Sequence, residues 1–132
     1  MNYKPFDLEE RLIDYSARVI IFSNTLPVTK TALYLSDQIV RSSTSPALNY
    51  GEARNAVSRN DFIHKMEVCL KELRESCNGL KIIQRANIQH SEAMLITLLN
   101  ECNELISIFV KSMETATKRK LSILENFKFN NR

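Results

Sequence analysis

Glycine and proline are scarce in this sequence, which has two glycines and three prolines among its 132 residues. Sandwiches and barrels need a turn residue about every ten positions, so an all-β fold is hard to build from it. Loops that cradle phosphate need closely spaced glycines, whereas Gly51 and Gly79 lie far apart. The scarcity therefore favours an all-α protein and excludes P-loop and Rossmann nucleotide sites.

Cysteine and histidine are also few. The three cysteines, Cys69, Cys77 and Cys102, form no C-x-x-C pair, which argues against both a disulfide framework and a structural zinc site. We interpret them as small core residues. A di-iron bundle needs paired Glu-x-x-His motifs, and this chain offers only Asp61-x-x-His64. We expect no metal, no cofactor and no small-molecule substrate.

Long apolar runs are missing as well. The longest purely aliphatic or aromatic run is Val19 to Phe22, far short of the roughly 20 residues that span a bilayer. The acidic start, Met1 to Glu10, lacks the basic n-region of a signal peptide. We therefore expect a cytoplasmic protein that makes no membrane contact.

Apolar residues at alternating steps of three and four predict four helices. The first begins after Asp7 as N-cap and ends at Pro27, and the second begins near Thr29 or Thr31. The third runs from about 59 to 84 behind a cap at Ser58, and the fourth runs from a cap at Asn87 or Ser91 to roughly residue 117. Short connections predict an antiparallel up-and-down four-helix bundle over residues 1–118, followed by a basic C-terminal tail over 119–132.

Pro46 lies inside the second predicted helix. Proline removes a backbone donor and clashes with the preceding turn, so we expect this helix to be kinked or broken near Pro46. The surrounding segment, residues 41–52, carries hydroxyls and an amide where a bundle normally has leucine. We interpret it as an interhelical network, with a polar recognition pocket as the alternative. The network residues are Arg41, Asn49, Glu52 and Glu75.

Positive charge gathers at the C-terminal end. Residues 1–110 hold 12 basic and 13 acidic residues, whereas 111–132 hold six basic and two acidic ones, giving −1 and +4. Such a segment attracts nucleic acid or another polyanion; the alternative is a set of cations that complement a helix end, followed by a solvated tail. Our candidate nucleic-acid-binding residues are Arg54, Arg59, Lys65, Lys118, Arg119 and Lys120.

The first and fourth predicted helices each carry an apolar face that is wider than packing inside one bundle needs. Ile13, Ile20 and Ile21 lie off the main stripe of the first helix, and Ile96 and Ile108 widen that of the fourth. Excess apolar width is usually buried against another subunit, so we expect a homo-oligomer. No convergent acid, base and nucleophile appears, because His64 and Cys69 point in different directions on one helix. An enzyme is not expected.

Two motifs carry a family resemblance. Arg41-Ser-Ser-Thr-Ser-Pro-Ala-Leu-Asn-Tyr-Gly-Glu52, with Asp61-Phe-Ile-His-Lys-Met66 and Lys71-Glu-Leu-Arg-Glu75 after it, resembles bacterial four-helix-bundle proteins named for open reading frames in 23S rRNA intervening sequences. This family is also described as ribosomal-protein-like. The likeness is strong over about 38–80 and extends, as a helix pattern, over about 5–118.

The resemblance implies a compact bundle, assembly into a ring of five, no enzymatic activity and association with RNA. A related subgroup serves diversity-generating retroelements as an accessory that contacts reverse transcriptase and nucleic acid. Arg41, Asn49, Glu52 and Glu75 match recurrent polar positions of the family. The nearly neutral body departs from the retroelement accessories. We therefore expect a non-catalytic oligomer that binds RNA or a ribonucleoprotein, the alternative being a protein-interaction scaffold without direct nucleic-acid binding.

Overall fold

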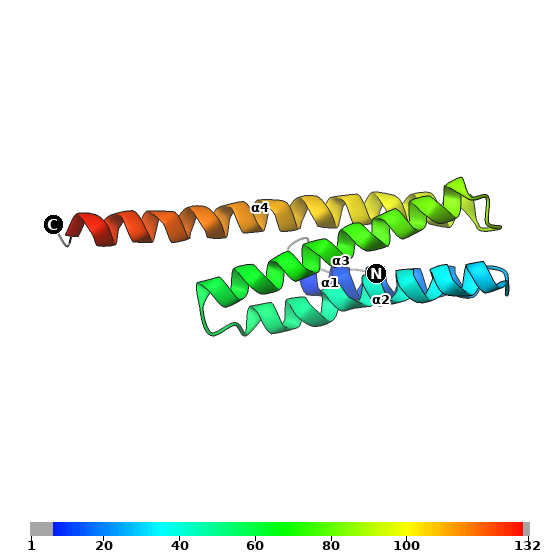
Figure 1. Ribbon diagram of the computed structural model, residues 1–132, viewed down its shortest axis with the longest axis horizontal. Helices are drawn as coiled ribbons and strands as arrows, with labels where there is room; N and C mark the ends of the chain where they lie inside the picture. Colours follow the sequence, from blue (N-terminus) through cyan, green and yellow to red (C-terminus); the bar gives the residue numbers. More distant parts are fainter. Residues whose placement is uncertain (1–6, 131–132) are drawn as a thin grey trace.

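The computed structural model describes residues 7–130, which form four helices and no strand. These are α1 (Leu8–Asn24), α2 (Lys30–Arg54), α3 (Arg59–Arg85) and α4 (Glu92–Asn130). Helices α1 and α3 each pack against α2 and α4, so they lie diagonally across the bundle from one another. Short connections make consecutive helices antiparallel (Figure 1). The predicted all-α, up-and-down four-helix bundle is confirmed.

A polar side chain caps the start of each helix. Asp7 accepts a hydrogen bond from the Glu10 amide at 3.1 Å, and Ser58 accepts one from the Asp61 amide at 3.0 Å. The sequence left two candidate caps each for α2 and for α4. The residue that caps α2 is Thr29, and the residue that caps α4 is Ser91. These caps satisfy backbone donors that have no partner inside the helix, so each helix begins where its sequence predicts.

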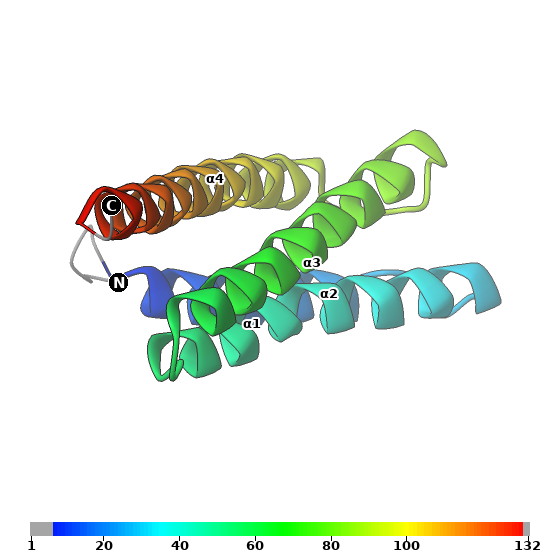
Figure 2. The same cartoon turned by 60° about the vertical axis from the view of Figure 1, so that its left-hand side comes forward.

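The core consists of the predicted apolar stripes. Figure 2 shows α3 lying between α2 and α4, where its inward side chains meet both neighbours. Helix α1 ends at Asn24, shortly before the predicted end at Pro27, and Leu26 stays buried in the loop that follows. The three cysteines are buried, as expected of core residues. The largest fully buried side chains are Tyr15, Phe22, Phe109, Leu12, Ile39, Met66, Leu73, Leu80, Ile83, Leu95, Leu98 and Leu105.

Helix α2 passes through Pro46 as a single helix, so the expected alternative of a break there is wrong. The ring removes the N–H that would reach the carbonyl of Ser42. One residue further on, the Ser43 carbonyl accepts a hydrogen bond from the Ser16 hydroxyl of α1 at 2.7 Å. Buried against its neighbours, the proline is held in the helix by tertiary packing. A kink at this position stays a prediction.

Helix α4 is longer than the sequence pattern predicted. It continues to Asn130 instead of ending near Thr117, so the expected tail is helical as far as the structure describes it. Ala116 is its last buried residue, and the helix then runs past the ends of α2 and α3 (Figure 1). Residues 131 and 132, part of the predicted tail, lie outside the described residues. The division at residue 118 stays a prediction.

Candidate nucleic-acid interface

Positively charged side chains meet where α4 leaves the bundle. Because α3 starts immediately after its cap, Arg59 stands in its first turn, facing the stretch of α4 that passes beside it. On α4, Lys111, Thr115 and Arg119 follow one another at four-residue steps and therefore share a face. Together these residues line a hollow of about 370 Å³, which Phe62, Ser112 and Ala116 complete.

The cations of this hollow are not neutralised by neighbours. Among residues 7–128, neither Arg59 nor Lys111 nor Arg119 forms an ion pair. The hydroxyls of Ser112 and Thr115 add hydrogen-bonding groups to the same wall. Guanidinium, ammonium and hydroxyl groups are the side-chain donors that contact phosphate oxygens in nucleic-acid complexes. This arrangement can hold an anion, and we refer to it as the cationic hollow.

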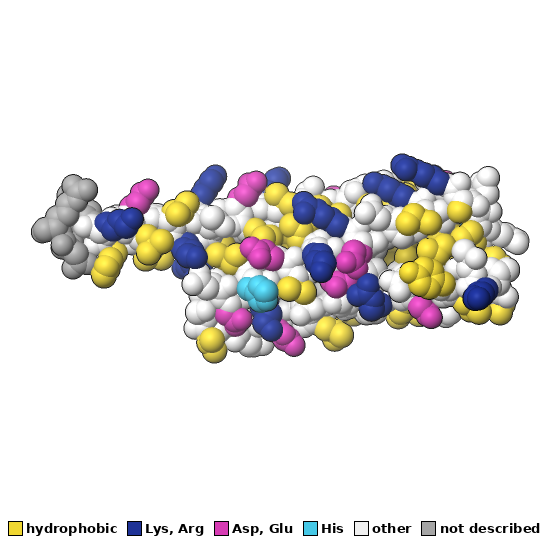
Figure 3. All heavy atoms as spheres, viewed as in Figure 1, with side chains coloured by type: hydrophobic (Ala, Val, Ile, Leu, Met, Phe, Trp, Pro, Cys, Tyr) yellow, Lys and Arg dark blue, Asp and Glu magenta, His cyan; other side chains and the backbone are white. Residues whose placement is uncertain are grey.

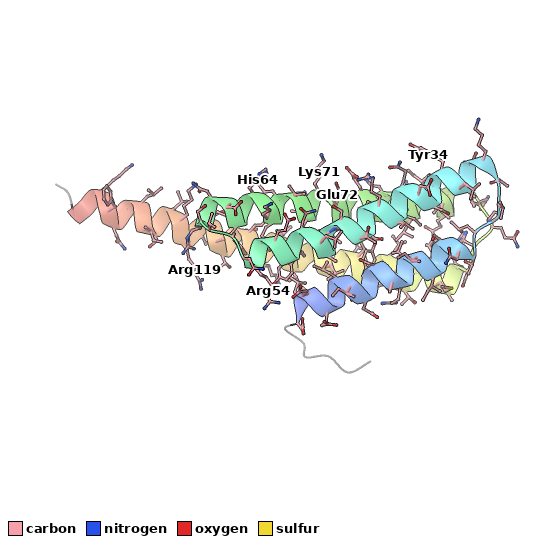
Figure 4. The ribbon with its side chains drawn as sticks, turned by 90° about the horizontal axis from the view of Figure 1, so that it is seen from below. Tyr34, Arg54, His64, Lys71, Glu72 and Arg119 are labelled. Carbon is pink, nitrogen blue, oxygen red and sulfur yellow. The ribbon has the colours of Figure 1, made fainter. Side chains whose placement is uncertain are left out.

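Two other predicted cations are engaged with carboxylates. Arg54 at the end of α2 pairs with Glu9 of α1 at 2.5 Å, and Lys65 of α3 pairs with Glu52 of α2 at 2.6 Å. The hydrogen bond from Glu52 raises the pKa of Lys65. A phosphate would have to compete with these carboxylates. Figure 4 shows Arg54 and Arg119 toward the end of the bundle from which α4 projects.

The last two predicted cations, Lys118 and Lys120, lie on the projecting part of α4. Lys118 is exposed and Lys120 is half-buried. Basic, acidic and apolar side chains lie interspersed along this part of the helix (Figure 3). Of the six predicted residues, the structure therefore brings Arg59 and Arg119 into one hollow and places the other four outside it. Lys111 was not predicted as a site residue, although its spacing of eight from Arg119 was a usable signal.

The predicted polar network is only partly interhelical. Arg41 donates hydrogen bonds to Glu75 at 3.0 Å and to Glu72 at 3.1 Å, which ties α2 to α3. Those carboxylates raise the pKa of Arg41, the Glu75 hydrogen bond most of all. Glu52 also reaches α3, through Lys65. Asn49 does not, because its amide bonds the Ser45 carbonyl and hydroxyl of its own helix.

Hydroxyl groups in the bundle centre are all bonded. The phenol of Tyr15 and the hydroxyl of Ser76 are 2.5 Å apart, and Ser76 also donates to the Leu73 carbonyl. Ser42 and Ser43 bond carbonyls of their own helix. Within the part of the chain that the structure describes, no buried side-chain nitrogen or oxygen lacks a partner. This pattern fits an interior network, because every buried side-chain nitrogen and oxygen of the described residues is already bonded.

The possible nucleophile and metal residues are kept apart. His64 is exposed on the outer side of α3 (Figure 4), whereas Cys69 is fully buried and its thiol donates to the Pro46 carbonyl. Burial raises the pKa of Cys69 to about 12, so the thiol stays protonated at neutral pH. Over the described residues, no group of three His, Cys, Asp or Glu side chains is placed to hold a metal ion.

Helix α4 is long and apolar enough to cross a membrane by length and composition, with a mean hydropathy of 1.5 in its most apolar window. Part of its apolar surface faces the core, however. Leu95, Leu98, Cys102, Leu105 and Phe109 are at most 2% exposed because they pack into the bundle core. Only 28% of that window is buried, but one helix of this kind is weak evidence for a membrane span.

Four antiparallel helices around an apolar core that contains a few bonded hydroxyls, with a cationic hollow at one end, define a small four-helix-bundle protein. Residues 6–111 match the family described as 23S rRNA-intervening sequence protein. The chain belongs to this family, which confirms the resemblance drawn from its motifs. Comparison with curated proteins finds no match.

A solved structure supports the same fold. The chain is similar to a protein of unknown function from the S23 ribosomal protein family of Bacteroides thetaiotaomicron VPI-5482, with 26% sequence identity and a TM-score of 0.71. The similarity covers 80% of this chain and 97% of that protein. The family match ends at residue 111, so the part of α4 that projects beyond Ala116 lies outside it.

Proposed function

We propose that this protein is a non-catalytic, cytoplasmic bundle protein that associates with RNA or a ribonucleoprotein, holding phosphate groups in the cationic hollow. The observation that carries the proposal is the convergence of Arg59, Lys111 and Arg119 without carboxylate partners among the described residues. The net charge of +4 after residue 110 adds a long-range attraction for a polyanion. Membership of a family named for 23S rRNA intervening sequences is consistent with such a partner.

A binding measurement with a structured RNA tests this proposal. The probe is a fluorescent hairpin from 23S rRNA, titrated with protein at about 50 and 200 mM salt. The triple variant R59A/K111A/R119A is expected to bind at least about tenfold more weakly, with a shallower salt dependence, because three phosphate contacts are lost. The matched control, R54A/K65A, removes two cations that already have carboxylate partners and should have a much smaller effect.

Two results would overturn the proposal. One is wild-type protein that fails to bind any structured RNA even at low salt. The other is a triple variant with unchanged affinity. All substituted side chains lie at the surface or at its edge, so circular dichroism of each variant can establish that the fold is retained.

Self-association is the second part of the proposal. Ile13, Ile20 and Ile21 of α1 and Ile96 of α4 are exposed, and a hollow of about 400 Å³ between the two helices is lined mainly by apolar side chains. Apolar surface of this kind fits a contact between copies of the chain, and the family resemblance suggests a ring of five. Light scattering during gel filtration measures the mass, and I20S/I21S should reduce it to that of a monomer.

The same apolar surface favours one alternative, a scaffold that binds protein and not nucleic acid. Co-purification with one dominant protein, unchanged by nuclease, would support the scaffold. Loss of that complex after nuclease treatment would support RNA association instead.

A further inference from the structure

Two of the buried cysteines lie at the same level of the contact between α3 and α4. The Cys77 thiol of α3 donates a hydrogen bond to Oδ1 of Asn103, the residue that follows Cys102 on α4, at 3.7 Å. The Cys102 sulfur lies 3.6 Å from the hydroxyl of Ser76, the residue that precedes Cys77 on α3. Each cysteine therefore contacts the sequence neighbour of the other. We call Cys77 and Cys102 the thiol pair.

The two thiols have different surroundings. Cys102 is fully buried, whereas Cys77 is 4% exposed and lies at the edge of the helix contact, beside the exposed Asn103. A hydrogen bond from Cys102 lowers the pKa of Cys77 to about 6, against the effect of burial, and the positive charge of Lys81 lowers it further. The same hydrogen bond, together with burial, raises the pKa of Cys102.

These differences give the two thiols different roles. The thiolate is the nucleophilic form of cysteine, and reactive cysteines lie in electropositive surroundings that are not fully closed to solvent. Cys77 fits this description, because Lys81 stands one helical turn after it. Cys102 is instead a protonated neighbour, positioned to react with Cys77 after Cys77 has been oxidised.

The third cysteine provides a contrast. Cys69 is fully buried, its thiol is bonded to the Pro46 carbonyl of α2, and its pKa is raised. It precedes Cys77 by eight residues on the same helix, which is about 12 Å of axial rise and too far for a disulfide. Cys69 therefore serves as an internal control for the thiol pair.

We propose that the thiol pair is a site of reversible oxidation by a hydroperoxide, which joins Cys77 and Cys102 in a disulfide between α3 and α4. This reaction goes beyond the proposed function and does not depend on it, because neither cysteine lines the cationic hollow. It also differs from a permanent disulfide framework. In a reducing compartment such a bond is transient, since cellular thiols reduce it again by exchange.

The reaction has two steps. The Cys77 thiolate first attacks one oxygen of the peroxide, the O–O bond breaks, and the departing hydroxide takes up the proton that Cys77 has released, which leaves a sulfenic acid on Cys77. The Cys102 sulfur then attacks the Cys77 sulfur, the S–O bond breaks, and the oxygen leaves as water with the Cys102 proton. In total the two thiols lose two electrons and two protons, and one hydrogen peroxide is reduced to two waters.

Peptide mapping of the full-length wild-type protein tests the bond. Hydrogen peroxide is the probe, and free thiols are alkylated before digestion. Trypsin cleaves after lysine and arginine, so it places the three cysteines in separate peptides, 66–71, 75–81 and 86–111. Mass spectrometry should find 75–81 joined to 86–111 in the oxidised protein, with two hydrogens fewer than the separate peptides, and dithiothreitol should release both.

Single substitutions test the roles of the two thiols. In C102S the oxidised Cys77 has no partner, so dimedone should trap its sulfenic acid on peptide 75–81. In C77S the remaining Cys102 should be oxidised at least about tenfold more slowly than Cys77 is in the wild type, because it is buried and protonated. The matched control is C69S, which should form the bond between Cys77 and Cys102 at the rate of the wild type.

The wild-type peptide map gives a result whether or not the variants fold. Absence of the joined peptides after peroxide treatment would refute the proposal, and so would a disulfide that contains Cys69 or that links two copies of the chain. Accumulation of sulfinic acid on Cys77 of the wild type, in place of the disulfide, would show that Cys102 does not reach it. Rapid oxidation of Cys102 in C77S would show that Cys77 is not the attacking thiol.

Discussion

Tyr15 of α1 and Ser76 of α3 join diagonal helices through a hydrogen bond of 2.5 Å between their hydroxyl oxygens. Both side chains are fully buried. Most contacts in an up-and-down bundle link adjacent helices, so this polar bond adds a direct tie between two helices whose backbones lie apart. The Ser76 hydroxyl also lies 3.6 Å from the Cys102 sulfur, which brings α4 into the same cluster.

Tyr15→Phe should lower the free energy of unfolding by about 1 kcal/mol, the net value of one buried hydrogen bond. The loss is limited because Ser76 keeps its bond to the Leu73 carbonyl. Chemical denaturation followed by circular dichroism measures it. Tyr34→Phe is the control, since that ring is 62% exposed, and it should change stability by less than about 0.5 kcal/mol. Equal effects of the two substitutions would contradict a role for the diagonal bond.

The two glycines should respond to alanine in opposite directions. A Cβ at Gly79 would lie 2.5 Å from Cγ2 of Ile39, so Gly79→Ala must push α3 away from α2 and should cost about 1–3 kcal/mol. At Gly51 the nearest atom, Oε1 of Glu9, is 3.7 Å away, and Gly51→Ala should stabilise the helix by about 0.5–1 kcal/mol. Thermal unfolding of both variants checks the prediction; a stabilising Gly79→Ala would show that the two helices separate without cost.

The loop before α4 should make stability depend on pH. His90 Nδ1 lies 2.5 Å from the Ile88 carbonyl, and Nε2 lies 2.6 Å from Glu92. The Ile88 hydrogen bond, together with Glu92, raises the pKa of His90, and the His90 hydrogen bond lowers the pKa of Glu92.

Both shifts favour the charged pair. The His90 contribution is fully present below the usual pKa of 6.5 and is lost as pH rises through the raised folded-state value. The Glu92 contribution is present above its usual pKa of 4.5 and is lost as pH falls. His90→Gln should therefore destabilise most between about pH 4.5 and 6.5 and least at pH values above the raised pKa of His90. Urea titrations across this range measure the difference, and a pH-independent difference would contradict the prediction.

A chain that stops after Lys118 should keep its core and lose helix. Nothing after Ala116 is buried among the described residues, so the free energy of unfolding should change by less than about 0.5 kcal/mol. The far-ultraviolet helical signal should nevertheless fall, because residues 119–130 are helical. An unchanged signal per molecule would mean that the deleted segment is not helical in solution, whereas a large loss of stability would mean that it packs on the body.

Local signals in the sequence were sufficient to predict most of the fold. Ser58 and Asp61 are a short-range pair, and a serine three residues before an acid at the start of an apolar stripe predicts a helix start without tertiary information. The end of α4 could not be predicted in this way. Lys118, Arg119 and Lys120 resemble cations of a last helical turn, but the residues after them contain neither glycine nor proline, and the helix continues.

The candidate site was less predictable because it depends on long-range contacts. Arg59 and Lys111 are 52 positions apart, and only the path of α4 beside the start of α3 brings them together. Asn49 was expected to reach α3, but its short amide side chain finds a carbonyl one turn back in its own helix. A carboxylate partner for Arg41 was easier to anticipate, since Glu72 and Glu75 lie one turn apart on a single face of α3.

The hydroxyl of Ser16 has consequences for the alignment of α1 and α2. It donates to the Leu12 carbonyl of its own helix and to the Ser43 carbonyl of α2, at 2.8 and 2.7 Å. Two helices that pack only through leucine side chains can shift along each other by one helical turn, because the apolar contacts after the shift resemble those before it. The buried Ser16 hydroxyl resists such a shift, because the shift would break its hydrogen bond to the Ser43 carbonyl. The Ser16 hydroxyl of α1 thus favours one axial offset between α1 and α2 over others that a purely apolar interface would accept.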